Sequence, residues 1–315
     1  MKKIFIIISL ISGMNINTLL SLELYKGENA ISSGTGGAYT AGENTTQCLF
    51  YNPANFSSIT KNYVSLSYNK YFSNLSSEVN LSTDEGYYPV DIYSQSISYI
   101  FPAKKIGGIG IFYSYFNFAS LRTLSIFGIS ASTSISRFIH YTIPINFGIT
   151  GKYIINKYIE NNYNESFFKT NPDSVSAIAM DIGISAQPSH SLNIGAYAGN
   201  IFSSDIGVKY SDLIPREYRI GIKYQFFVKL LNNSPDKINI FSDFQYENKD
   251  YNIFIGSELF LNSFRIRAGL NFNYISFGIG YIYHSLIGIN YSLNYLISNL
   301  DDTSFNHKIN IYFNF

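Results

Sequence analysis

The sequence is poor in charge, cysteine and tryptophan. Charged residues make up 14% of the 315 residues, and 22 Lys and Arg nearly balance 21 Asp and Glu. This balance gives no electrostatic reason to expect a nucleic acid or an acidic substrate as a partner. Cys48 is the only cysteine, so a disulfide framework within the chain is excluded. Tryptophan is absent, and the aromatic content of 17% consists of 28 Tyr and 26 Phe.

Long hydrophobic runs are also missing beyond the N-terminal end. Lys2 and Lys3 precede an apolar run at residues 4–11, and small polar residues follow to about Ser21. A charged start and an apolar run too short to span a bilayer predict a cleaved signal peptide over residues 1–21. No later run approaches the roughly 20 apolar residues of a membrane helix, which excludes a helical membrane protein.

Over most of the chain, apolar side chains alternate with polar ones instead. In residues 217–227, Tyr218 and Ile220 share one face, while Arg219 and Lys223 share the other. A period of two places neighbouring side chains on opposite sides of a β-strand. The pattern therefore predicts strands with one apolar and one polar face.

These segments predict an all-β protein, a transmembrane antiparallel β-barrel of about fourteen strands over residues 62–315. Most segments have the 9–11 residues of a tilted strand that crosses a bilayer, and single-chain barrels of this type have an even strand number. Tyr and Phe are expected to gather where the wall meets water. The predicted strands lie near residues 62–72, 92–101, 106–117, 121–131, 137–159, 175–187, 191–201, 216–229, 237–246, 251–261, 264–272, 275–285, 287–296 and 306–315.

The long predicted connections all follow odd-numbered strands, whereas the links after the third, ninth and eleventh strands are short and the one after the eighth strand has about seven residues. Bacterial barrels have long loops at one end and short turns at the other. The pattern favours such a barrel over a secreted soluble β-protein, and it puts both termini in the periplasm. Long polar connections follow the first, fifth, seventh and thirteenth strands, at residues 73–91, 160–174, 202–215 and 297–305.

The C-terminal end carries a further indication. Residues 307–315 alternate apolar and polar side chains and stop on Phe315. A chain with this ending resembles bacterial outer-membrane β-barrel proteins. The resemblance implies that Phe315 is an assembly signal read by the barrel assembly machinery. It also implies a location in the bacterial outer membrane, in contact with its lipids.

Residues 22–61 do not alternate. They are rich in Gly, Ala, Ser, Thr and Asn, and Gly and Pro at this density favour a compact, turn-rich segment. Fourteen strands enclose a lumen wider than small barrels fill with side chains. We therefore expect this segment to fold back as a hatch that plugs the lumen, with a tail in the periplasm as the alternative.

Two short motifs in this segment resemble a known family. Residues 36–41 read Gly-Gly-Ala-Tyr-Thr-Ala, and residues 51–54 read Tyr-Asn-Pro-Ala. Their order is similar to the start of FadL-type long-chain fatty acid transporters and of the related PorV/PorQ-like outer-membrane proteins. Later stretches at 180–184, 214–216 and 267–270 also match. The resemblance implies a hatch that carries Asn52-Pro53-Ala54. It also implies a hydrophobic ligand that enters from outside, is held in an apolar pocket and leaves when the hatch moves, partly sideways into the membrane.

The residues assigned to hatch and gating are Gly36, Gly37, Ala38, Asn52, Pro53 and Ala54. Pro fixes φ, and an Asn side chain readily bonds neighbouring backbone amides. Together they could hold the hatch against the wall. The alternative interpretation is an ordinary Asn-Pro turn that enters the first strand.

Charged side chains also fall on the inferred inner faces of neighbouring strands. Ionised groups that face lipid cost about 2–4 kcal/mol near the midplane, so these groups are expected to point inward. Opposite charges on adjacent strands predict an ion-paired ladder, which either forms a polar track or hatch contact or braces the wall. The predicted ladder consists of Arg219, Lys223, Asp243, Glu247, Glu258, Arg265 and Arg267.

Catalytic and metal-binding patterns are absent from the sequence. The four histidines lack metal-ligand spacing, and neither a Gly-x-Ser-x-Gly motif nor a phosphate loop occurs. We expect no enzyme activity, no cofactor and no metal. The leading function is passive uptake of hydrophobic small molecules, with long-chain fatty acids as the first candidate. The alternatives are a PorV-like accessory protein that binds exported proteins, and a surface adhesin that uses the loops at 73–91 and 160–174.

Overall fold

The structure is a computed structural model. It describes residues 28–73, 80–83, 86–89, 91–103, 106–119, 121–137, 143–160, 165–229, 235–297 and 305–315. The predicted signal peptide over residues 1–21 and the first residues of the predicted hatch, 22–27, lie outside the described residues.

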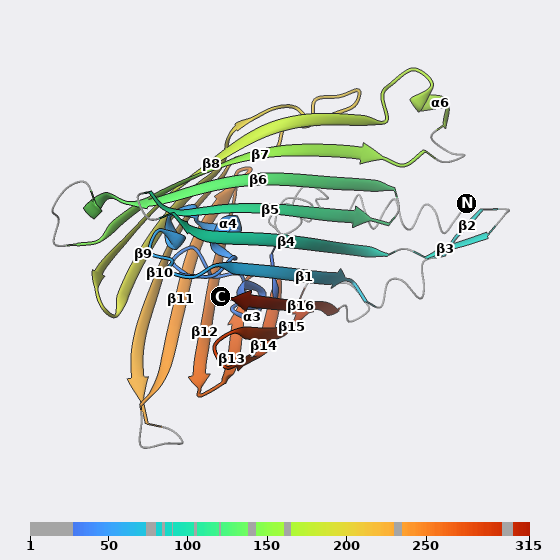
Figure 1. Cartoon of the computed structure of the whole chain (residues 1–315). Helices are drawn as coiled ribbons and strands as arrows, with labels where there is room; N and C mark the ends of the chain where they lie inside the picture. The colour runs from blue at the N-terminus through green and yellow to red at the C-terminus, as the bar shows by residue number, and fades with distance from the viewer. Residues whose placement is uncertain are drawn as a thin grey trace.

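Fourteen antiparallel strands in the described part of the chain close into a barrel (Figure 1). Each strand pairs with its neighbours in the chain, and the last strand pairs with the first, with Tyr63 opposite Asn314. The predicted fold class is therefore confirmed. The barrel strands are β1 (Tyr63–Tyr71), β4 (Ile92–Ala103), β5 (Gly107–Phe118), β6 (Arg122–Ser134), β7 (Ile145–Tyr158), β8 (Ser174–Ser189), β9 (Leu192–Ser203), β10 (Glu217–Val228), β11 (Asp236–Glu247), β12 (Asp250–Leu261), β13 (Phe264–Leu270), β14 (Tyr274–Tyr283), β15 (Ile287–Leu296) and β16 (Phe305–Asn314).

Short elements complete the described chain. The first long loop contains a separate hairpin of two strands. No helix among the described residues is long and apolar enough to cross a membrane. These elements are α3 (Ala30–Gly34), α4 (Cys48–Tyr51), η1 (Pro53–Phe56), β2 (Asn80–Thr83), β3 (Gly86–Pro89), η2 (Ile135–Arg137) and α6 (Glu165–Phe168).

The predicted strand boundaries agree with the structure to within a few residues, except for the fifth strand. Its predicted start at residue 137 is wrong, because η2 ends there and β7 begins at Ile145. Pro144 directly precedes β7 and has no N–H to donate to a ladder, so it suits the position before the first strand residue.

The alternation of the sequence becomes the two faces of the wall. Apolar side chains such as Ile129, Ile178 and Phe277 point outward and are 67%, 65% and 58% exposed. Their strand neighbours point inward, as Ser130 does at 1% exposure. An apolar outer face is the surface that a bilayer requires. The inner face is rich in Ser, Asn, Gly and charged residues.

The four long connections predicted after odd-numbered strands all lie at one end of the barrel, although that end also has short turns at β5–β6, β11–β12 and β13–β14, and the opposite end has the longer β6–β7 connection. We call these ends the loop end, where β1 ends, and the turn end, where β1 begins. The connections β1–β4, β7–β8, β9–β10 and β15–β16 are at the loop end. At the turn end, Asn62 and Phe315 exchange backbone hydrogen bonds of 2.9 and 3.1 Å, which ties the chain end to the first strand.

Residues 28–59 lie inside the barrel, and we call them the hatch segment. Figure 1 shows α3 and α4, in blue, enclosed by the strands. Most of this segment is buried. Its helix α3 contacts β13 to β16, and η1 contacts β6, β7 and β8. The main hydrophobic cluster of the protein therefore forms between this segment and the wall.

Candidate functional site

The hatch segment rests on a set of glycines that face the lumen, which we call the glycine seat. A Cβ added at Gly148 would lie 2.3 Å from the carbonyl carbon of Pro53, and one at Gly183 would lie 2.0 Å from Asn52 Oδ1. Real side chains do not tolerate such distances, so the wall backbone approaches the segment only because these positions lack a Cβ. The glycine seat consists of Gly108, Gly110, Gly148, Gly183, Gly195, Gly221, Gly256, Gly269 and Gly278.

Strand register brings these glycines together. Gly148 of β7 lies opposite Gly183 of β8. Gly195 of β9 likewise lies opposite Gly221 of β10. Residues that face each other in a ladder share one height along the barrel. The seat is thus made of paired gaps in the wall, at the level where the hatch segment crosses the lumen.

Asn52 connects the two halves of the hatch segment to the wall. Its Oδ1 accepts a hydrogen bond of 3.0 Å from the N–H of Ala54, which caps η1 at Pro53. Its Nδ2 donates to the carbonyl oxygens of Thr40 and, on β8, Ile184, both at 3.1 Å. An ordinary turn into β1 is therefore wrong for this motif, because η1 follows it and its bonds reach β8.

The predicted residues Gly36, Gly37 and Ala38 lie against the opposite wall. Gly36 and Gly37 have φ of +68° and +86°, the left-handed region that favours glycine. The carbonyl oxygen of Gly37 accepts a hydrogen bond of 3.0 Å from Arg219 Nη1. Ala38 is fully buried beside Phe241. This run turns the segment so that the Gly37 carbonyl meets Arg219 and the Gly36 carbonyl meets the side-chain amide of Asn271.

Asp243 on β11 is the main polar anchor of the hatch segment. Its Oδ2 accepts hydrogen bonds from the N–H of Tyr39 at 2.9 Å, the N–H of Thr40 at 2.8 Å and Thr40 Oγ1 at 2.7 Å. Arg219 Nη1 lies 3.8 Å from the same oxygen. Asp243 is 1% exposed, so its charge is held by the chain and not by bulk water. Bonds of this kind to an ionised acceptor are stronger than neutral ones.

All seven residues of the predicted ladder face the lumen, and Arg265 is the least buried of them. Two of the predicted cross-strand pairs are present, Arg219 with Asp243 and Arg267 with Glu258, and the other members have partners elsewhere. Arg219 pairs with Glu217 on its own strand as well as with Asp243. Lys223 reaches Glu43 of the hatch segment. The hatch segment fills the space that a cross-strand ladder would need, so it takes several of the partners.

The other members have separate partners. Arg267 Nη2 lies 2.8 Å from Glu258 Oε1, which is the predicted cross-strand pair. Glu247 accepts a hydrogen bond of 2.7 Å from Gln245 Nε2. Arg265 donates to two backbone oxygens near the turn that precedes it. The wall charges therefore form small groups around the hatch segment.

Sequence reasoning missed two buried ion pairs of the lumen, one of which joins the hatch segment to the wall. Glu28 pairs with Lys308 of β16, and both side chains are almost fully buried. Lys152 and Asp181 form a pair of 2.7 Å across β7 and β8. The signal was present, because a carboxylate in an enclosed segment needs a cation, and Lys308 lies on the inward face of the last strand.

The lumen wall is apolar between the hatch segment and the loop end on one side. We call this surface the apolar wall, and it belongs to β4 to β8. Its inward side chains are buried and belong to the main hydrophobic cluster. The apolar wall consists of Ile92, Phe116, Leu124, Ile126, Ile154, Ala177 and Ala179. Ile206 and Ile214 of the β9–β10 loop join the same cluster.

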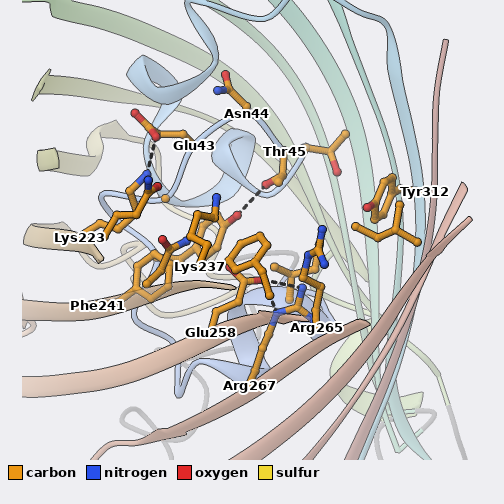
Figure 2. A pocket seen from close by; sticks show the side chains of 18 of the residues that line it. Glu43, Asn44, Thr45, Lys223, Lys237, Phe241, Glu258, Arg265, Arg267 and Tyr312 are labelled. Atoms are coloured by element: carbon orange, nitrogen blue, oxygen red, sulfur yellow. Dashed lines mark hydrogen bonds and ion pairs between the residues drawn. The ribbon is translucent and has the colours of Figure 1, made fainter. Parts of the chain in front are cut away.

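A cavity of about 370 Å³ lies in the turn-end half of the lumen, beside the hatch segment (Figure 2). Glu43, Asn44 and Thr45 of the hatch segment form one side of it. Side chains of β10 to β14, β1 and β16 form the rest. Its volume is within the range of about 300–1,000 Å³ that is common for small-molecule pockets.

Cys48 is buried in α4, with its Sγ 3.4 Å from the carbonyl oxygen of Gly42. Burial raises the pKa of the thiol to about 12. The thiol is therefore protonated and unreactive while the hatch segment is seated. No group of three His, Cys, Asp or Glu side chains in the described part of the chain could hold a metal ion.

No family model and no curated relative matches this sequence. Solved structures do match. The toluene transporter TbuX of Ralstonia pickettii has a TM-score of 0.60 at 11% identity, over 93% of this chain and 98% of that chain. The Pseudomonas putida toluene transporter TodX gives 0.55 at 12% identity, over 92% and 97%. A Pseudomonas aeruginosa FadL homologue gives 0.51 at 12%, over 91% and 96%.

These matches cover nearly the whole of both chains. The protein has the fold of FadL-type outer-membrane transporter barrels. The predicted resemblance to that group is confirmed for the fold. The resemblance to PorV and PorQ proteins stays a prediction.

Proposed function

We propose that this protein is a passive outer-membrane channel for hydrophobic small molecules, with long-chain fatty acids as the first candidate. The apolar wall is the observation that carries the proposal. A hydrophobic solute gains about 25 cal/mol for each Å² of apolar surface that leaves water. The Leu, Ile and Phe side chains of the apolar wall, which neighbouring side chains now bury, would make such contacts with a solute that enters between the loop end and the hatch segment.

The hatch segment is the proposed gate. In the described ladders of the barrel, register shifts occur only between β8 and β9. The remaining ladders are continuous and leave no gap between strands. A solute that follows the apolar wall past them therefore meets the hatch segment. Asp243 and Asn52 hold that segment by hydrogen bonds and not by covalent links. Its displacement would open a way to the turn end without an energy source or a cofactor.

The fold supports the proposed location in the outer membrane. A closed barrel with an apolar outer face satisfies every backbone group without an open sheet edge, as a membrane wall must. The barrels that it resembles include proteins described as toluene transporters. Exported protein partners and host surfaces stay predictions from the sequence.

Uptake by cells tests the proposal. Cells that lack the protein should take up labelled long-chain fatty acid and labelled toluene more slowly than cells that carry it. Uptake should return with the natural chain. Equal uptake of both solutes with and without the protein would reject the channel function. If cells without the protein are slower only in toluene uptake, the transported solutes are uncharged hydrocarbons and not fatty acids.

A further inference from the structure

The turn-end cavity carries more positive than negative side chains. Its charged lining residues are Glu43, Lys223, Lys237, Glu258, Arg265 and Arg267. Lys223 pairs with Glu43. Arg267 pairs with Glu258 at 2.8 Å, and Figure 2 shows both pairs as dashed lines. These pairs use both carboxylates, which leaves two positive groups.

Lys237 and Arg265, the two cations outside these pairs, lie on either side of one aromatic ring. Lys237 lies opposite Phe260 in the β11–β12 ladder, and Phe260 lies opposite Arg265 in the β12–β13 ladder. Lys237 Nζ is 3.9 Å and Arg265 Cζ is 4.4 Å from the centre of the Phe260 ring. Among the described residues, no carboxylate lies within 4 Å of either group. A ring face attracts cations but does not neutralise them.

Two like charges on either side of a ring, in a partly enclosed space, favour an anion at the edge of that ring, where it can approach both. The same cavity is lined by apolar and aromatic side chains, including Phe241, Phe260 and Tyr312. Tyr63 and Ile282 add to this surface. The lining therefore offers positive charge and apolar contact to one and the same ligand.

We propose that this cavity is a binding site for the anionic head group of an amphiphile, a carboxylate or phosphate joined to an apolar chain. Lys237 and Arg265 would contact the head group, and the aromatic lining would contact the first part of the chain. The proposal rests on the proposed function in one respect, namely that a hydrophobic solute reaches the lumen. It adds a site on the turn-end side of the hatch segment and a charge requirement for the ligand.

Equilibrium binding to the purified full chain in an uncharged detergent tests the site. Labelled laurate, dodecyl phosphate and dodecanol are compared at pH 8, where the first two are anions and the third is neutral. In the double variant Lys237→Gln and Arg265→Gln, binding of both anions should weaken at least about tenfold, because each lost charged contact is worth about that much. Dodecanol binding should not change.

Lys169→Gln is the matched control, because Lys169 is an exposed lysine directly after α6 that pairs with Glu165. It should bind all three ligands like the natural chain. Lys237→Arg should retain anion binding, since it keeps the charge. Compact migration of the unheated protein on a gel reports that each variant is a folded barrel.

Three results would overturn the site. Laurate and dodecyl phosphate could bind the double variant as tightly as the natural chain, or dodecanol binding could fall by the same factor as anion binding. Anion binding could also fall equally in the Lys169→Gln control. The channel function has a separate readout, because toluene uptake by cells that carry the double variant does not depend on this charge.

Discussion

The apolar wall of β4 to β8 and the charged wall of β10 to β13 hold the same hatch segment by different forces. On the apolar side the contacts are packing contacts, such as the rings of Phe50 and Phe112 at 4.6 Å. On the charged side they are directional, as between Asp243 and the N–H groups of Tyr39 and Thr40. A hydrophobic solute can replace the packing contacts between the hatch segment and the wall. It cannot replace hydrogen bonds to an ionised group.

This difference suggests a division of labour. The charged wall fixes the position of the hatch segment, and the apolar wall leaves room for competition by a hydrophobic ligand. Substitutions on the two walls should therefore have different effects. Those on the charged wall should loosen the segment, and those on the apolar wall should reduce uptake while the segment stays seated. The predictions below follow this contrast from the largest expected effect to the smallest.

Asp243→Ala should have the largest effect. It removes three hydrogen bonds to the hatch segment and leaves Arg219 with fewer partners, and such a loss costs about 3–5 kcal/mol in buried sites. The single thiol of Cys48 reports the result. Its alkylation rate should rise about 100-fold or more, the change that such a cost allows. Asp173→Ala, which alters an exposed carboxylate paired with Lys157, is the control. An unchanged rate in Asp243→Ala would mean that Asp243 does not anchor the segment.

Gly148→Ala should unseat η1 from β6, β7 and β8, the strands that it contacts. The added methyl group meets the backbone of Pro53 at 2.3 Å, and overpacking of this kind costs about 1–3 kcal/mol. Gly151→Ala on the same strand is a matched control, because a Cβ there has no heavy atom within 4 Å. Single-channel conductance in planar bilayers should rise in the first variant and stay at the natural level in the second. Equal conductance in both variants would mean that the close fit at the glycine seat does not keep the channel closed.

Leu124→Asn combined with Ile126→Asn should reduce uptake of a hydrophobic solute by about 3- to 10-fold, since two apolar contacts are lost from its path. Cys48 alkylation should stay slow, because the hatch anchors lie elsewhere. The control exchanges the same side chains for apolar ones, Leu124→Ile with Ile126→Leu, which keeps volume and polarity nearly constant. Full uptake by the double Asn variant would place the solute path away from the apolar wall.

Alkylation of Cys48 in the natural chain should depend on pH more steeply than that of a free thiol. Only the thiolate reacts, and with a pKa of about 12 its share rises about tenfold per pH unit between pH 8 and 10. In Asp243→Ala the released thiol has a pKa near 8.5, so the rate should level off above about pH 9. The measurement is the rate of reagent uptake against pH. A plateau at pH 9 in the natural chain would show that Cys48 is not enclosed.

The wall could be predicted from the sequence because each strand carries its own signal. The alternation of Tyr218, Arg219 and Ile220 indicates which side chains face lipid. The lengths of the connections indicate which end of the barrel carries the long loops. The exception at residues 137–144 arises because η2 and its connection contain enough apolar residues to continue the pattern. The inward direction of the charged residues followed from the same period of two.

The contacts of the hatch segment could not be predicted in this way. No local pattern places Thr40 beside Asp243, which is 203 residues away, or Glu28 beside Lys308. Asn52 and Pro53 stood out as a motif, but their bonds to β8 depend on the height at which the segment crosses the barrel. Lys237 was absent from the predicted ladder, although it lies beside Phe260 and Arg265 in the structure.

The glycine seat also has a consequence for the order of assembly. Residues 28–59 precede every strand of the described chain, but their binding surface is spread from β5 to β16, and α3 lies against the last four strands. That surface is complete only when β16 has paired with β1. The hatch segment is therefore made before the strands but reaches its place after them, and a seated hatch segment marks a barrel that has closed.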